Sequence, residues 1–330
     1  MEKSILPIEP LKVNTGDIDL SPGPFCMSFH FDLEKLKLSI GRFGVLNPPY
    51  LLRTSGDKFA VVAGYRRLLA ISELGWKKIV CHVLPATYPP LEALLLNLNE
   101  NLIHRQLNSI EKGMVLQSLA QFISPDEILK EYMPVLALPA NTQVLGLFMG
   151  LGTFDDEIRS SIATDKISLR VVGLMRDMGR DDQLKINTLL TTLKWTFNQQ
   201  WEITQWIIEI ASREGLKIRE VVDERDINVV LKNGNMNNPQ KVKAIARILR
   251  KRRFPALVES ERLFKKGISN LALPSRVRIL PPPFFEGMDY RIEIVFREGK
   301  ELREKLVELS SLPGLEEVTE YWKIKNHIVH

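Results

Sequence analysis

The sequence predicts an α+β protein with an N-terminal α/β domain, a central all-helical domain and a small C-terminal strand-helix-strand unit. Short strand-like and helix-like runs alternate over the first third, and helical spacing dominates from residue 107. Pro281-Pro282-Pro283 then separates a last short alternation. At roughly 100–200 residues per domain, the chain is long enough for two or three domains. We expect these domains to enclose residues 1–106, 107–272 and 284–330.

The N-terminal domain is predicted from local capping and turn signals. Asp32 is a good N-cap residue and Gly44 a good helix terminator, so a helix is expected between them. The segment Thr54-Ser55-Gly56-Asp57 has the composition of a tight hairpin turn. The expected elements are a helix over 33–42, strands over 50–53 and 58–63, a helix over 66–74, a strand over 78–84 and a helix from Pro89-Pro90 to about residue 105.

The remainder of the chain is predicted to be helical until its last fifty residues. A turn-rich segment, 233–238, interrupts the helices, and apolar residues alternate with polar ones over 290–296, as in a strand. The expected helices are 109–122, 126–133, 141–149, 154–163, 169–178, 182–214 with a break, 217–232 and 239–253. The C-terminal unit is expected to consist of a strand over 290–296, a helix over 300–309 and a strand over 317–324.

The composition excludes several classes of protein. With 26% charged and 45% hydrophobic residues, the chain matches an ordinary globular protein rather than a disordered or fibrous one. No apolar run approaches the roughly 18 residues of a membrane span, and residues 1–10 lack a secretory signal, so we expect a cytoplasmic protein without membrane association. Cys26 and Cys81 lack partners at metal-ligand spacing, which argues against a zinc site or a disulfide framework.

Positive charge is concentrated in one segment. Between Lys241 and Gly267 ten basic residues stand against two acidic ones, a net charge of +8, whereas the rest of the chain sums to −3. The expected helix over 239–253 carries most of these cations, which could contact several DNA phosphates. A solvated helix or an acidic protein partner is the alternative interpretation. The candidate DNA-binding residues are Lys241, Lys243, Arg247, Arg250, Lys251, Arg252 and Arg253.

Two segments of the N-terminal domain could form a ligand site. At Gly64-Tyr65-Arg66-Arg67 a glycine leaves a strand and two arginines open a helix, a combination that suits a phosphate. Asn97, Glu100, Asn101, His104 and Arg105 form one polar stripe on the next long helix, away from its leucines. A carboxylate beside an amide can hold a divalent cation. Taken alone, a Gly-x-Arg-Arg turn is more often a solvated helix start, and such a polar stripe is more often a solvent-facing ion-pair cluster.

The order of these segments resembles the motif series of ParB N-terminal domains. The resemblance covers about residues 5–112 and is most specific in its last segment. It implies the ParB/sulfiredoxin fold, in which the glycine turn and the Glu-Asn helix face one cleft that binds a nucleoside triphosphate, CTP in ParB, with magnesium. The segments that carry it are Ser39-Ile40, 44–49, 64–70 and 100–111.

The resemblance also implies individual roles. Gly64, Arg66, Arg67, Asn101 and Arg105 match nucleotide-binding positions, and Glu100 with Asn101 matches the metal-supporting pair. The chain departs from the pattern at Tyr65, Leu69 and Ser109, and it lacks an arginine before Phe31, so nucleotide binding is better supported than hydrolysis. Sulfiredoxin needs a catalytic cysteine at the glycine turn, where Tyr65-Arg66 stands here, and peroxiredoxin repair is therefore excluded.

Three functions follow as hypotheses. The first is a ParB-like, nucleotide-switched DNA-binding homodimer acting in chromosome or plasmid partition or in transcription regulation, with the C-terminal unit as a dimerisation element. Its helix-turn-helix would lie within 111–178, yet 141–152 offers Thr142 and Gln143 without any Lys or Arg for reading bases. The second is an enzyme on the same fold, namely a slow nucleoside triphosphatase, a nuclease or a small-molecule kinase. The third is a degenerate module whose basic helix only binds a protein partner.

Overall fold

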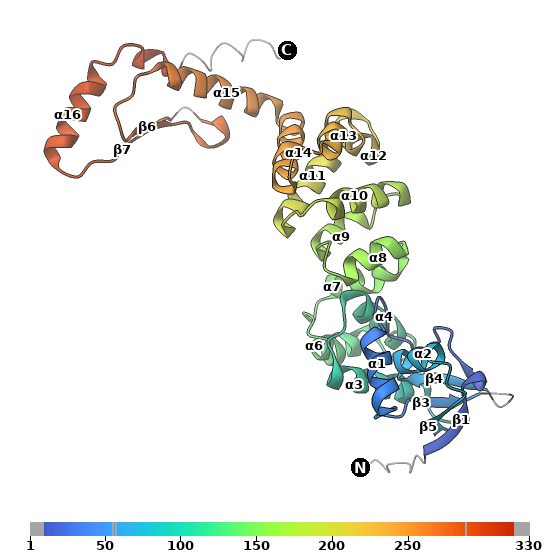
Figure 1. The fold of residues 1–330 in the computed structure, drawn as a ribbon. Coiled ribbons are helices and arrows are strands. Elements are labelled where there is room, and N and C mark those ends of the chain that lie inside the picture. The colour runs from blue at the N-terminus through green and yellow to red at the C-terminus, as the bar shows by residue number, and fades with distance from the viewer. Residues whose placement is uncertain (1–9, 55, 57, 288, 320–330) are drawn as a thin grey trace. The chain divides into compact units, whose positions relative to one another are not determined.

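The computed structural model describes residues 10–54, 56, 58–287 and 289–319 (Figure 1). It confirms the predicted fold class, with an N-terminal sheet domain, a helical central region and a small C-terminal unit. By internal contacts the chain divides into residues 1–204 and 205–330. The domain boundaries expected from the sequence stay predictions, and each compact unit is described by itself below.

The N-terminal domain is built on a five-stranded sheet with the strand order β1-β5-β3-β4-β2. β3, β4 and β5 confirm the three predicted strands, whereas β1 and β2 were not predicted. β3 pairs antiparallel with β4, as the predicted hairpin requires, and parallel with β5. Ser55 and Asp57 of the hairpin turn lie outside the described residues. The strands are β1 (Pro10–Asn14), β2 (Ile18–Asp19), β3 (Tyr50–Arg53), β4 (Phe59–Ala63) and β5 (Lys78–Leu84).

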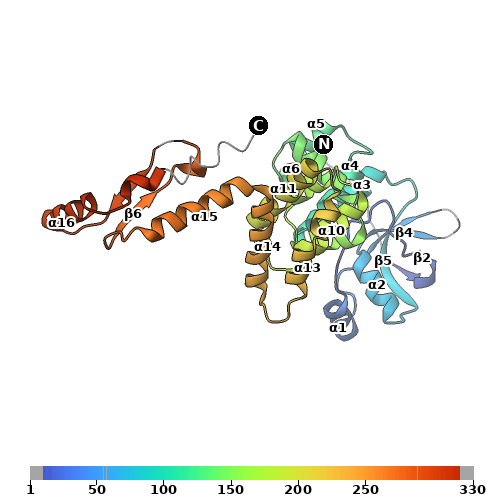
Figure 2. The same cartoon turned by 90° about the horizontal axis from the view of Figure 1, so that it is seen from above.

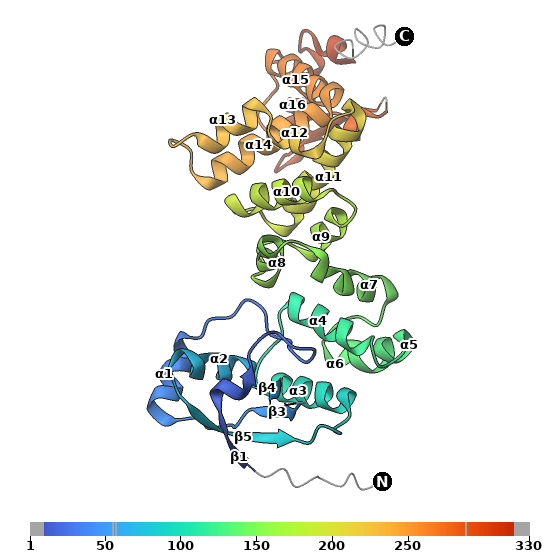
Figure 3. The same ribbon diagram turned by 90° about the vertical axis from the view of Figure 1, so that its right-hand side faces the viewer.

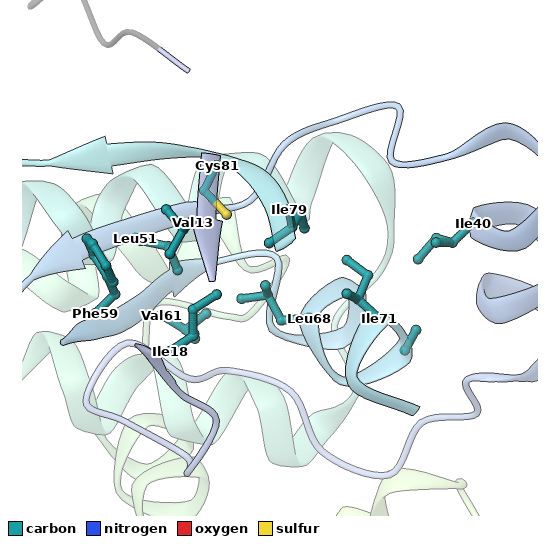
Figure 4. Packing of buried hydrophobic residues seen from close by; sticks show 11 residues of the cluster. Val13, Ile18, Ile40, Leu51, Phe59, Val61, Leu68, Ile71, Ile79 and Cys81 are labelled. Atoms are coloured by element: carbon teal, nitrogen blue, oxygen red, sulfur yellow. The ribbon is translucent and has the colours of Figure 1, made fainter. Parts of the chain in front are cut away.

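Three helices of this domain confirm predicted ones, α1 (Glu34–Phe43), α2 (Tyr65–Glu73) and α3 (Pro90–His104). Helix α1 ends at Gly44, whose φ of 75° belongs to the left-handed region that glycine tolerates best. Apolar side chains of α1 and α2 pack on the sheet in one cluster, which Figure 4 shows running from Phe59 to Ile40. This cluster fixes the position of α2, and therefore of the two arginines at its start.

The rest of the first unit is helical, as predicted (Figure 3). The expected helix over 126–133 is interrupted: a π-helix over Ile128–Tyr132 separates α5 from α6. Pro134 lacks the amide hydrogen that a continuous α-helix would need there. The helices are α4 (Ser109–Leu119), α5 (Pro125–Glu127), α6 (Met133–Val135), α7 (Thr142–Gly150), α8 (Asp156–Ala163), α9 (Leu169–Met175) and α10 (Arg180–Thr192).

Helix α11 (Phe197–Glu214) crosses the division and leads into the second unit, where α13 and α14 form a helical hairpin (Figure 2). The expected helix over 217–232 is broken at Asp223-Glu224, and the helix α15 was missed although Pro255 opens it. None of the described helices is long and apolar enough to cross a membrane. The remaining helices here are α12 (Ile218–Val222), α13 (Arg225–Lys232), α14 (Asn238–Arg253) and α15 (Pro255–Asn270).

The described residues of the C-terminal unit form two strands and a helix, and one of these strands was not predicted. β6 (Val277–Leu280) pairs antiparallel with β7 (Arg291–Ile294), and α16 (Gly299–Ser310) follows. β7 and α16 confirm the predicted strand and helix. The strand that pairs with β7 among the described residues therefore precedes it in the chain, and this strand, β6, was not predicted. Residues 317–319 belong to a 3₁₀ helix, and the rest of that expected strand lies outside the described residues.

Cys81 lies on β5 with no exposed surface, and burial raises the pKa of its thiol to about 12. The thiolate is the nucleophile, and each unit by which the pKa exceeds its ordinary value lowers the thiolate fraction at pH 8 about tenfold. We therefore expect native Cys81 to react with iodoacetamide at pH 8 about a thousandfold more slowly than an ordinary cysteine, and faster as pH rises. Mass spectrometry of labelled peptides checks this expectation, with the urea-unfolded chain as the control. Equal rates in the native and unfolded chains would contradict it.

Candidate functional site

The polar residues predicted to face one another line a cleft of about 270 Å³ between α2 and α3. The structure brings together every predicted cleft residue, although the first turn of α2 and the end of α3 lie more than thirty residues apart in sequence. Asn97 and His104 of the same polar stripe also line the cleft. The predicted residues found there are Gly64, Arg66, Arg67, Glu100, Asn101 and Arg105.

Gly64 forms the turn between β4 and α2. Its φ of 90° is a left-handed conformation that side chains rarely adopt. A Cβ atom there would lie 2.7 Å from Cβ of Pro49 and 2.9 Å from Nη2 of Arg67. Only glycine therefore fits this position while Arg67 keeps its place in the cleft.

The Arg67 side chain is already occupied by acceptors from two sides. Its Nη2 forms an ion pair with Glu100 of α3, and its Nη1 donates to the backbone oxygen of Asn47 at 2.5 Å. Both charged side chains are partly exposed, at 15% for Arg67 and 22% for Glu100. Water and ions can therefore reach this pair from the cleft.

Arg66 points to the other end of the cleft. Its Nη2 donates to Oε1 of Glu111 at 2.5 Å, and its guanidinium lies 4.7 Å from the centroid of the Phe31 ring. Burial lowers the pKa of Arg66 below its ordinary value, nearby Arg105 lowers this pKa further, and Glu111 raises it. The guanidinium thus lies between a like charge, Arg105, and the opposite charge of Glu111.

Two side chains of α3 and that of Arg105, the residue after its end, form a hydrogen-bonded series along the cleft wall. Asn97 is buried and donates to the backbone oxygen of Phe25 at 2.6 Å. Asn101 donates to Oδ1 of Asn97 at 2.7 Å, and Arg105 donates through Nε to Oδ1 of Asn101, also at 2.7 Å. Each member fixes the next, so the Arg105 guanidinium is held in a defined orientation.

Glu111 is the functional residue that the sequence interpretation did not single out. Its side chain is only 1% exposed and accepts hydrogen bonds from Arg66 and Arg105, each at 2.5 Å. It also accepts from the backbone nitrogens of Phe29 at 3.1 Å and Asn108 at 3.0 Å. The second of these closes a capping box at the start of α4. The Asn-x-x-Glu spacing could have predicted the cap. The spacing does not show that the Glu111 carboxylate is buried beneath two arginines.

The cleft is thus a cationic site in which each arginine is paired with a carboxylate. Three guanidinium groups face the carboxylates of Glu100 and Glu111 across it. An anionic ligand that displaced these carboxylates would find planar donors able to form two hydrogen bonds each. No group of three or more His, Cys, Asp or Glu side chains among the described residues is arranged to hold a metal. A cation here would therefore need further ligands, such as phosphate oxygens.

The candidate DNA-binding residues all lie on α14, in two different environments. Arg250, Arg252 and Arg253 form ion pairs with glutamates of neighbouring helices, and Lys241 donates to the backbone oxygen of Leu231 at 2.7 Å. The other three candidates are exposed, and the described part of the chain offers them no ion-pair partner. They are Lys243, Arg247 and Lys251.

Comparison with known proteins bears directly on the cleft. The family description "ParB N-terminal domain" matches residues 21–102. The chain carries a ParB N-terminal domain. The matched ParB region includes the Gly64 turn and the Glu100-Asn101 pair, but it ends before Arg105 and Glu111. The ParB recognition made from the sequence is thereby confirmed.

Curated relatives extend the ParB likeness beyond this domain. A probable chromosome-partitioning protein ParB from Campylobacter jejuni is 27% identical over 208 residues, which cover 62% of this chain and 71% of the relative. A nucleoid occlusion protein from Bacillus anthracis is 30% identical over 110 residues, 32% of this chain. The match spans 36% of that relative, about a third of its length.

Among solved structures, two of ParB from Caulobacter crescentus are similar to parts of the chain. The one complexed to the centromeric parS site is 15% identical, with a TM-score of 0.34, and covers 59% of this chain and 98% of its own. The one complexed with CTP-gamma-S is 19% identical, with a TM-score of 0.26, and covers 55% and 98%.

Proposed function

We propose that this chain is a ParB-like DNA-binding protein whose cleft binds a nucleoside triphosphate of the CTP type with magnesium and acts as a switch. The observation that carries the proposal is the convergence of Arg66, Arg67 and Arg105 on one cleft beside the Gly64 turn. Relatives named as a chromosome-partitioning protein and as nucleoid occlusion proteins support a role in DNA segregation or its regulation.

The triphosphate would bind by replacing carboxylates on the arginines. Arg67 and Glu100 are the more exposed pair, whereas Glu111 is buried and holds four donors. Glu100 is therefore the carboxylate that is more easily displaced, although the Arg67 side chain is 15% exposed against 27% for Arg66 and 20% for Arg105. The α2 amides that follow Gly64 would add further donors, because helix N-termini favour anions.

The residues present fit a magnesium ion that arrives with the nucleotide. Glu100 supplies one carboxylate, and Asn101 supplies an amide oxygen that already accepts from Arg105. Magnesium in nucleotide sites commonly takes one or two protein ligands and completes its shell with phosphate oxygens and water. Bound there, the ion would neutralise phosphate charge, and Glu100 and Asn101 are the residues that would hold it.

DNA binding is proposed for α14, and homodimerisation for the C-terminal unit. The α14 candidates remain the seven basic residues from Lys241 to Arg253. Within the described residues of the C-terminal unit, β6 and β7 form a two-stranded sheet, and Ile292, Val295 and Phe296 are about half exposed. Such a small sheet is marginally stable by itself, so a second copy covering these side chains would stabilise it.

A thermal-shift measurement of the full chain with CTP and magnesium tests the switch. At a hundredfold excess over Kd, ligand binding should add about 2.7 kcal/mol and raise Tm by roughly 5 °C or more. Arg67→Ala should abolish this rise, because it removes the cation that would bind phosphate oxygens in place of Glu100. Lys35→Ala, an exposed change on α1, should keep the rise. The absence of a shift with CTP, ATP, GTP and UTP alike would contradict the proposal.

A further inference from the structure

The basic residues of α14 are separated by their ion pairs into two sets. Arg252 binds Glu214 of α11 at 2.5 Å and Glu224, next to α13, at 2.6 Å. Arg253 pairs with Glu209 of α11, and Arg250 makes two hydrogen bonds to Glu261 of α15, at 2.7 and 2.8 Å. The charges of these three arginines are balanced within the protein. They fix α14 among its neighbours and are poorly placed to attract an outside anion.

Lys241 donates to the backbone oxygen of Leu231, and the other three cations form a single row. Lys243, Arg247 and Lys251 are spaced by four residues and are all exposed. On an α-helix this spacing gives one face, with a rise of about 6 Å between neighbours. Val242, Ile245 and Leu249 occupy the opposite face and are buried. The row therefore points away from the packed side of the helix.

This row costs stability unless something binds it. Like charges four residues apart on a helix repel each other, at a few tenths of a kcal/mol per pair. None of the three side chains has an ion-pair partner within the described ranges, and all three are exposed. Their arrangement thus suits an external partner that carries repeated negative charge.

Duplex DNA fits this row better than a base-specific site would. Phosphates along one strand recur at about 3.4 Å of helix axis, so cations about 6 Å apart can reach alternate phosphates. The row lacks the Asn or Gln that reads adenine and the Glu or Asp that reads cytosine, and it offers only cations, which bind the phosphates of any sequence. In addition, α7 in the region expected to read bases carries no Lys or Arg.

We infer that Lys243, Arg247 and Lys251 form a surface that binds the phosphate backbone of duplex DNA independently of its base sequence. This inference rests on the proposed DNA-binding function and specifies how that function is carried out. Asp226, at the start of α13, lines the same shallow depression as Arg247 and Lys251 and is exposed. As an anion beside the row, it weakens the attraction for phosphates.

The test measures binding of the full chain to two labelled duplexes of equal length and unrelated sequence, over a range of salt concentrations. Changing Lys243, Arg247 and Lys251 to Gln should reduce the slope of log K against log salt by about 2.7, because each phosphate contact contributes about 0.9. The reduction should be the same for both duplexes. Asp226→Asn should tighten binding to both.

Two control variants separate this row from net charge and from the rest of α14. Changing exposed Lys12, Lys35 and Lys78 to Gln removes the same total charge from the first unit and should leave the slope unchanged. Arg252→Gln removes a balanced cation of α14 and should lower Tm without changing the slope. Circular dichroism establishes that each variant remains helical.

Each other outcome overturns the inference in a different way. If the native chain binds DNA and the triple α14 variant keeps the full slope, DNA contacts a different surface. If the variant loses only one of the two duplexes, the row reads sequence. If the native chain binds neither duplex in low salt, the proposed DNA-binding function fails together with the inference.

Discussion

Replacing Glu111 with alanine should lower the free energy of unfolding of the first unit by about 3–5 kcal/mol, the range for removing one member of a buried ion pair. The Glu111 side chain is 1% exposed, and its loss leaves Arg66 and Arg105 facing each other without their shared acceptor. The same change removes one half of the capping box of α4. It should therefore be among the most destabilising single substitutions in this chain.

Urea unfolding followed by circular dichroism measures this loss. Glu92→Ala, an exposed change on α3, should stay within about 0.5 kcal/mol of the native chain. Glu111→Gln keeps the size of the side chain and an acceptor oxygen but lacks the charge, so its loss should be intermediate. A cost for Glu111→Ala below about 1 kcal/mol, the value of a cap alone, would refute the central role given to this carboxylate.

Gly64→Ala should abolish the CTP-dependent rise in Tm. The added Cβ atom meets Pro49 and the Arg67 guanidinium at less than 3 Å, and the φ of 90° is strained for alanine. Arg67 would have to move out of the cleft, which would break its contacts with Glu100 and with the backbone of Asn47. The variant should also lose about 1–3 kcal/mol of stability through backbone strain.

Gly41→Ala is the matched control for this prediction. Gly41 lies within α1, and no atom lies within 4 Å of where its Cβ would be. Alanine should stabilise this exposed helix position by up to about 1 kcal/mol and leave the nucleotide response intact. A Gly64→Ala chain that still gained the full CTP-dependent shift would show that the turn does not shape the nucleotide site.

The sequence predicted the cleft well because its signals are local. A glycine at a strand end, two arginines at a helix start and a polar stripe on the next helix each depend on spacing alone. Packing of α2 and α3 on one sheet then brings Gly64, Arg67 and Glu100 together. The bound nucleotide and the metal remain predictions.

What the sequence could not supply depends on contacts between distant segments. In β1 only Val13 is buried, and β2 has two residues, so neither strand shows the alternation by which strands are recognised. The strand β6 was missed because the segment it pairs with, Arg291–Ile294, lies more than ten residues further along the chain. The sequence does not distinguish the seven cations of α14. Three of them, Arg250, Arg252 and Arg253, are paired with glutamates that come from three other segments of the chain.

The position of Glu111 also decides where the nucleotide domain can be cut from the chain. A fragment that ended at Gln106 would keep all three cleft arginines and lose the carboxylate that holds two of them, and one that ended at residue 102, where the ParB match stops, would lose Arg105 as well. Its arginines would repel one another, and it would fold poorly or bind anions indiscriminately. A fragment carried through Leu119, the end of α4, retains the complete charge arrangement and is the smallest piece in which isolated nucleotide binding would be meaningful.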